Sequence, residues 1–130
     1  MSPPIVFILD RDLGFVFWLG EIFSEAGCQT VPAMNSEQAL SIIRELKLQV
    51  DIVVVDLGLA GVAAMIQAMS DGRPLKIVAI RGDDDLGYAI QAHATLERPS
   101  ASSRISREEW LARVRELLRE IVTTRHVKES

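Results

Sequence analysis

The stretch Asp51-Ile-Val-Val-Val-Asp56 places four β-branched apolar residues in a row between two carboxylates. Residues of this type favour strands, and a strand without polar alternation is typical of a parallel sheet covered by helices on both faces. Parallel α/β folds place their sites outside the carboxyl ends of such strands. Asp56 is therefore the first candidate functional residue, and the alternative is that it only begins a loop or caps a helix.

Two more apolar runs end in charged residues. Ile5–Leu9 leads into Asp10, Arg11 and Asp12, and residues 76–80 lead into Arg81. Strands at these places, separated by segments of helical periodicity, predict βαβ units and a parallel sheet with right-handed crossovers. The charged residues would then meet at one edge of the sheet. Weaker strands are expected at 29–31, before the breaker Pro32, and at Ala94–Glu97.

Helix signals fill the gaps between these strands. Gly27 ends the first periodic stretch, either Asn35 or Ser36 caps the second, and Ser106 with Glu109 forms a capping box for the last. The expected helices cover residues 13–26, 36–46, 60–69, 83–93 and 106–121. Five strands thus alternate with five helices, which predicts a doubly wound α/β fold.

Size and composition limit the protein to one domain. The 130 residues are 48% hydrophobic and 25% charged, which suits a single core, expected over 5–121, with a frayed tail at 122–130. The net charge of -4 gives no basic surface for nucleic acid. Cys28, the single cysteine, is expected to be a packing residue in a reducing cytoplasm. No leader and no apolar stretch of membrane length is seen, so we expect a cytoplasmic protein that does not contact membranes.

The order and spacing of these segments resemble the receiver domain of bacterial two-component response regulators from about residue 5 to residue 121. The segments that carry the resemblance are Ile5-Val-Phe-Ile-Leu-Asp10, Asp51-Ile-Val-Val-Val-Asp-Leu-Gly-Leu59, Leu96-Glu-Arg-Pro99 and Trp110-Leu-Ala-Arg-Val-Arg-Glu-Leu-Leu118. The resemblance implies a flavodoxin-like fold, in which a five-stranded parallel sheet lies between two layers of helices.

The resemblance also implies a site and partners. Asp56 would accept a phosphoryl group from a histidine kinase, with Asp10 and Asp56 holding a magnesium ion and Gly58 in the loop behind. Arg98 takes the place of the family's lysine. The domain would be a signalling module rather than an enzyme, and homodimers would form through 83–93, 94–97 and 106–121.

Several positions depart from the family pattern, among them Ala60, in place of a proline, and Ala63-Ala64, in place of an Asp-Gly pair. Arg11 replaces the second acidic metal ligand, and a guanidinium cannot ligate a cation. Arg81 replaces the small hydroxyl residue, Thr95 the aromatic switch residue, and Arg98 the lysine. Asp12 is a candidate substitute ligand. If the arginines point inward, they neutralise the carboxylates and compete with magnesium; if they extend into water, the pocket keeps its acidic character.

Our main hypothesis is therefore an atypical receiver that acts as a protein-interaction module, with impaired or absent magnesium-dependent phosphorylation of Asp56. One alternative is a conventional phosphorelay receiver. Another is an α/β domain that binds anions or nucleotides through its arginines. The sequence has neither a dinucleotide fingerprint nor a P-loop, and Cys28, His93 and His126 suggest no catalytic triad.

Overall fold

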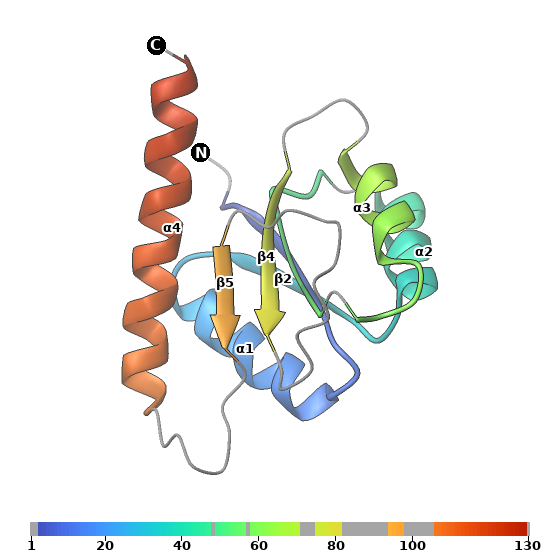
Figure 1. Cartoon of the computed structure of the whole chain (residues 1–130), viewed down its shortest axis with the longest axis horizontal. Coiled ribbons are helices and arrows are strands. Elements are labelled where there is room, and N and C mark those ends of the chain that lie inside the picture. Colours follow the sequence, from blue (N-terminus) through green and yellow to red (C-terminus); the bar gives the residue numbers. More distant parts are fainter. Residues whose placement is uncertain are drawn as a thin grey trace.

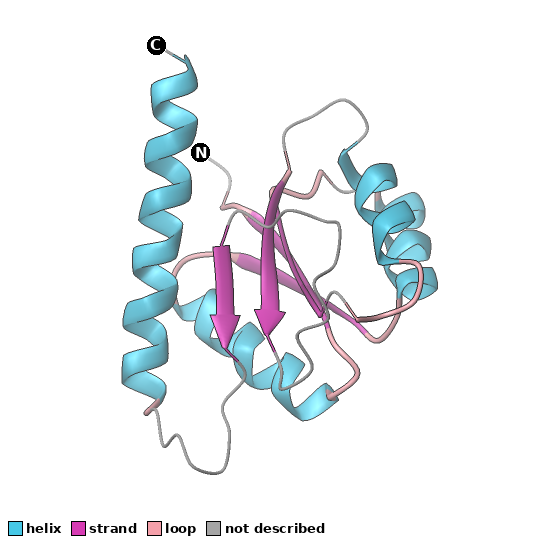
Figure 2. Cartoon of the chain, in the orientation of Figure 1, coloured by secondary structure: helices cyan, strands magenta, loops and turns pink. Residues whose placement is uncertain are grey.

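The computed structural model describes residues 3–47, 49–56, 58–70, 75–81, 94–97 and 106–129, with side chains at all of these except 81, 97 and 121–129. Within these residues the chain forms one parallel sheet between two layers of helices (Figure 2). The expected helix at 83–93 and Arg98 lie outside the described residues.

All neighbouring strands of the sheet are parallel, in the order β2-β1-β3-β4-β5. This is the strand order of flavodoxin-like folds, with the reversal of winding between β1 and β3. The strands are β1 (Ile5–Leu9), β2 (Gln29–Ala33), β3 (Ile52–Asp56), β4 (Lys76–Arg81) and β5 (Ala94–Glu97). The predicted α/β class and five-stranded sheet are thereby confirmed (Figure 1).

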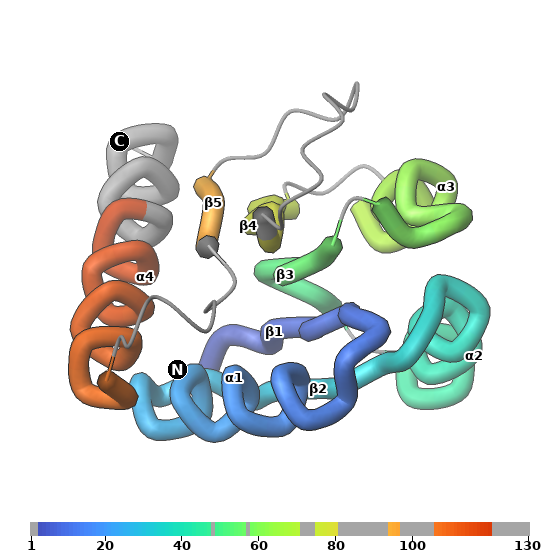
Figure 3. The backbone as a smooth tube through the Cα atoms, turned by 60° about the horizontal axis from the view of Figure 1, so that its bottom comes forward, coloured from blue at the N-terminus to red at the C-terminus, as the bar shows by residue number. Residues whose placement is uncertain are grey.

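Two helices cover each face of the sheet within the described residues. The helices are α1 (Leu13–Glu25), α2 (Ser36–Leu46), α3 (Val62–Ser70) and α4 (Arg107–Glu129). Figure 3 shows α1 and α4 on one face and α2 and α3 on the other. The helix expected from residue 106 onward is α4.

Side-chain caps start three of the helices. Asp12 Oδ1 accepts from the Phe15 N–H at 3.2 Å, and Ser106 Oγ accepts from the Glu109 N–H at 3.2 Å. Asn35 Oδ1 accepts from the Gln38 N–H at 2.8 Å, which settles the choice between Asn35 and Ser36. Each cap satisfies a backbone donor that the first helical turn leaves unpaired.

Two expected boundaries were wrong. The last helix continues to Glu129, beyond residue 121, where we expected it to end. Residues 122–129 contain neither glycine nor proline, and adding a residue to an existing helix is easier than starting one. Strand β2 also continues through Pro32, which we expected to break it.

The position of Pro32 in the sheet explains why it is tolerated. Strand β2 lies at the sheet edge, and the Gln29 N–H donates to Pro4 O toward β1 at 2.9 Å. Along a strand, the backbone nitrogens of successive residues point alternately to the two sides. Those of Thr30 and Pro32 therefore point away from β1. A proline there removes no hydrogen bond from the ladder.

The sheet separates two apolar clusters. Under α1 and α4 the largest buried side chains are Trp110 and Phe23, and under α2 and α3 they are Phe7, Leu9 and Met65. At about 25 cal/mol per Å² of apolar area, these clusters provide the main favourable term in folding. No helix in the described part of the chain is long and apolar enough to cross a membrane.

Cys28 belongs to the α1/α4 cluster and is 7% exposed, as expected for a packing residue. Burial, together with the nearby Asp51 carboxylate, raises the pKa of its thiol to about 11. The thiolate is therefore disfavoured at neutral pH, which makes this side chain a poor nucleophile.

Candidate functional site

The sheet register brings Asp10 and Asp56 to the same edge. Leu9 of β1 pairs with Val55 of β3, and each is followed directly by one of the two carboxylates. Asp10 is fully buried, whereas the Asp56 side chain is 17% exposed. The predicted pairing of carboxylates at strand ends is therefore present, with Asp56 the one that solvent reaches.

Asp10 shapes the loop between β1 and α1. Its Oδ1 accepts from the Asp12 N–H at 2.9 Å, a local bond of the kind that turns the chain after a strand. Asp12 itself is exposed, and its Oδ1 accepts the hydrogen bond that caps α1. Its carboxylate thus has a structural role at the start of α1.

Arg11 approaches Asp56 from that same loop. Its Nη2 atom lies 4.0 Å from Asp56 Oδ2, although 77% of the arginine side chain is exposed. Ion pairs this exposed are worth about 0–1 kcal/mol, because water screens them. The geometry is therefore an inward-leaning cation beside Asp56, weaker than the buried pair that would lock the pocket.

The other Asp56 oxygen is held by the loop between β3 and α3. Asp56 Oδ1 accepts from the Gly58 N–H at 2.9 Å, and the Leu59 N–H donates to Asp56 O at 3.1 Å. Gly58 was a predicted pocket residue, and the structure places its backbone against the carboxylate. These two bonds fix the orientation of the side chain relative to the strand.

Ser36 connects this loop to α2. Its buried hydroxyl donates to Ala60 O at 2.8 Å, and a Cβ on Gly61 would lie 3.5 Å from the serine side chain. Gly61 has φ 77°, a conformation that side-chain-bearing residues rarely adopt. Sequence reasoning missed this contact, because Ser36 was considered only as a helix cap.

The remaining predicted residues are only partly placed. Asp56 of β3 pairs with Ile80 of β4, and the next residue on β4 is Arg81. The backbone of Arg81 pairs with that of Glu97 at the same edge of the sheet. The side chain of Arg81 and the whole of Arg98 lie outside the described residues. Thr95 is on β5, paired with Ala79 and exposed.

The residues at this edge place a guanidinium beside a carboxylate. Nowhere in the described chain do three or more His, Cys, Asp or Glu side chains gather closely enough to hold a metal. Asp10 and Asp56 supply oxygen ligands of the kind magnesium takes, but Arg11 brings a positive charge to Asp56. A cation entering here would have to displace or repel that guanidinium.

Comparison with known proteins identifies the fold. No family model matches the sequence, and no curated protein matches it either. Solved structures do match. A CheY-like response regulator receiver domain from Methylobacillus flagellatus is 22% identical with a TM-score of 0.69, over 92% of this chain and 99% of that one.

Two further structures agree with that result. The signal receiver domain of an HD domain-containing protein from Pseudomonas fluorescens Pf-5 is 18% identical, with a TM-score of 0.68 over 97% of this chain and 94% of that one. NtrX from Brucella abortus is 19% identical with a TM-score of 0.71; 98% of this chain matches 29% of that protein. The chain therefore has the receiver-domain fold, as the sequence predicted.

Proposed function

We propose that this chain is a signalling receiver whose Asp56 occupies the phosphoacceptor position, and that it acts through protein contacts with magnesium-dependent phosphorylation impaired or absent. The observation that carries the proposal is the 4.0 Å approach of Arg11 to Asp56, at the position where the family has an acidic metal ligand. A tethered cation there partly neutralises Asp56 and opposes a divalent ion. The domain is then a binding module rather than an enzyme.

The surrounding contacts support a pocket with a fixed geometry. Asp10 and Asp56 each accept a backbone N–H, from Asp12 and Gly58 respectively. Asp56 nonetheless remains partly open to solvent, so the carboxylate is accessible to a phosphodonor. The step that the arginine hinders is therefore cation binding rather than access.

The test is phosphorylation by a small-molecule phosphodonor with magnesium, read by intact-protein mass. We expect the wild type to gain no adduct or only a trace, and Arg11→Asp to gain one that does not form when magnesium is chelated. Asp56→Asn in the Arg11→Asp background should abolish it. Arg113→Asp, an exposed change on α4, makes the same change of charge away from the site and should behave as wild type.

Ready phosphorylation of the wild type, lost on chelation and in Asp56→Asn, would contradict the proposal and favour a conventional phosphorelay receiver. The partner of such a receiver would be a histidine kinase. In the proposed mode, the partner surface includes β5 and α4, and the same surface serves for a homodimer; residues 83–93, which we also expected there, lie outside the described residues. Light scattering of the purified chain with and without phosphodonor would then give one unchanging mass.

A further inference from the structure

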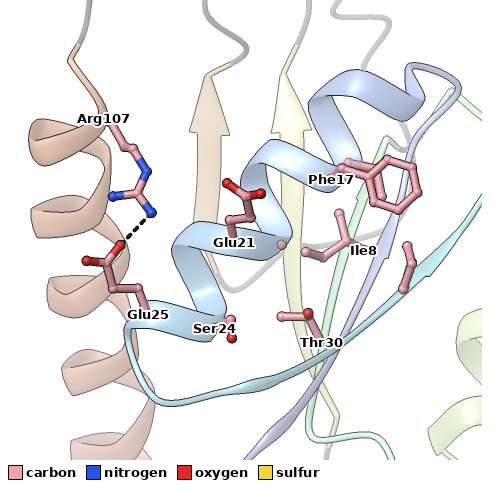
Figure 4. Close-up of a pocket in the computed structure, with 10 residues that line it drawn as sticks. Ile8, Phe17, Glu21, Ser24, Glu25, Thr30 and Arg107 are labelled. Atoms are coloured by element: carbon pink, nitrogen blue, oxygen red, sulfur yellow. Dashed lines mark ion pairs between the residues drawn. The ribbon is translucent and has the colours of Figure 1, made fainter.

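A groove of about 590 Å³ lies between α1 and the edge strand β2 (Figure 4). Its lining includes the buried side chains of Ile8 and Val16, which are 1% and 0% exposed. Thr30 and Pro32 of β2 also line it, and Phe17 lies at one end. The groove is separate from Asp56 and its contacts, so an argument about it does not depend on phosphorylation.

The groove exists because α1 leaves the edge strand partly uncovered. Gly20 in α1 has no side chain, and a Cβ there would lie 3.6 Å from Thr30 Oγ1 and 3.8 Å from Ile8 Cδ1. A larger residue would have to extend over the strand. The glycine therefore leaves a notch midway along the helix, open to an incoming side chain.

Phe17 makes the groove attractive to an apolar partner. Its side chain is 58% exposed. Phe17 precedes Gly20 by three residues, about one helical turn, so the ring borders the notch. Single exposed aromatics are common, but this one adjoins a concave surface with an apolar floor. A bulky side chain entering the notch would contact the Phe17 ring together with the accessible side chains of Thr30 and Pro32.

The charge of the groove is acidic and only partly compensated. Helix α1 contains Glu21 and Glu25 and no basic residue. Arg107 of α4 pairs with Glu25 at 2.5 Å, the dashed contact of Figure 4, whereas Glu21 makes no ion pair with any residue that the structure describes. The rim thus presents one carboxylate for an incoming cation.

The outward nitrogen of Pro32 and the acidic charge of the groove decide which kind of partner can bind there. An added strand is disfavoured, because Pro32 lacks the outward N–H that it would need. A second copy that packed α1 against α1 would bring acidic residues together, which is unfavourable. We propose that the α1–β2 groove binds a basic amphipathic helix of a partner protein, with an apolar side chain in the notch at Gly20 and a lysine or arginine paired with Glu21.

The lengths are compatible with that partner. The 13 residues of α1 extend for about 20 Å, enough to align with three to four turns of another helix. Recognition of this kind uses apolar anchors spaced three or four residues apart, flanked by charges that select the partner. Phe17, the notch and Glu21 follow one another along α1 in that manner.

The test uses the full chain and synthetic helical peptides of about 15 residues, with leucines on one face and lysines on the other. Titration is followed by backbone amide NMR shifts. We expect shifts centred on Phe17, Gly20 and Thr30, and binding about tenfold tighter than that of a matched peptide with glutamates for lysines. Gly20→Leu should fill the notch and abolish the shifts.

Two variants and one control separate the contributions. Phe17→Ser should weaken binding about fivefold, and Glu21→Lys should make the glutamate peptide the better ligand. Leu46→Ser removes a side chain that is 63% exposed on α2 and should leave binding unchanged. Thermal unfolding confirms that each variant folds.

Three results would overturn the proposal. They are no shifts at about millimolar peptide, shifts that map elsewhere, and equal loss of binding in Leu46→Ser and Phe17→Ser. A change of oligomeric mass in Phe17→Ser would assign the groove to a second copy and would likewise be contrary to it. None of these outcomes depends on Arg11 or Asp56, so this test is independent of the test of the proposed function.

Discussion

The two faces of the sheet are packed in different ways. Under α1 and α4, Trp110 packs against both Phe15 and Trp18, with ring centroids 6.4 Å and 5.2 Å away in edge-to-face arrangements. Under α2 and α3 the core consists mainly of aliphatic side chains around Met65 and Ala39. The first face ties a distant helix to the domain, because α4 is separated in sequence from α1 by most of the chain.

The difference bears on the site. On the α2/α3 face the Ser36 hydroxyl and the packing of Leu59 hold the loop after Asp56, whereas the α1/α4 face has a large aromatic contact. Trp110 Nε1 is buried and finds no hydrogen-bond acceptor within the described structure. An unpaired buried donor opposes folding, so Trp110 stabilises the domain through its apolar area and ring contacts.

The largest expected effect is that of Trp110→Ala. Removing a fully buried indole should lower the free energy of unfolding by about 3–5 kcal/mol, because the transfer and cavity terms add. Met65→Ala on the opposite face should cost about 2–4 kcal/mol. Urea unfolding measures both, and a greater loss in Met65→Ala would reverse the proposed ranking of the two faces.

A smaller effect is expected from Ser36→Ala. The change leaves Ala60 O without its 2.8 Å hydroxyl donor and should cost about 1 kcal/mol. Amide hydrogen exchange at 58–61 should accelerate more than exchange in the β1 strand. Ser41→Ala, an exposed change in the same helix, is the control. Equal exchange in both variants would show that α2 does not fix the Asp56 loop.

The smallest effect at neutral pH concerns Cys28. Its pKa of about 11 in the folded protein exceeds that of an unfolded thiol, so the native state keeps the proton longer. This contribution to stability is complete below the unfolded pKa and is lost as pH rises toward 11. Cys28→Ala should flatten the decline of unfolding free energy between about pH 9 and 11. An unchanged slope would contradict the assigned pKa.

Much of the fold could be predicted from local sequence. The run of β-branched residues before Asp56 indicated a buried strand, and Ser106 with Glu109 indicated where the last helix begins. Errors arose where tertiary position overrides propensity. Pro32 remains in β2 because its backbone nitrogen points outward at an edge of the sheet. No local sequence pattern reveals that position.

The site was predicted in part for the same reason. Asp10 and Asp56 follow apolar strands, so a parallel sheet had to bring them to one edge. Asp12 was a candidate ligand, yet it caps α1, because an aspartate just before a helix is close to that helix's free N–H groups. Ser36 was missed, since its acceptor lies 24 residues further along the chain.

The sequence by itself determined which residues stand at the ends of the strands, because the period of apolar residues and the chain order dictate a parallel sheet. It also placed Arg11 directly after Asp10 at one of these strand ends. Only the tertiary structure decided that Arg11 leans toward Asp56, that Glu21 is left beside an open notch, and that Glu25 is matched by Arg107. The physical reason is that a strand's end follows from local pattern, whereas the direction of a charged side chain depends on partners and solvent that only packing brings together.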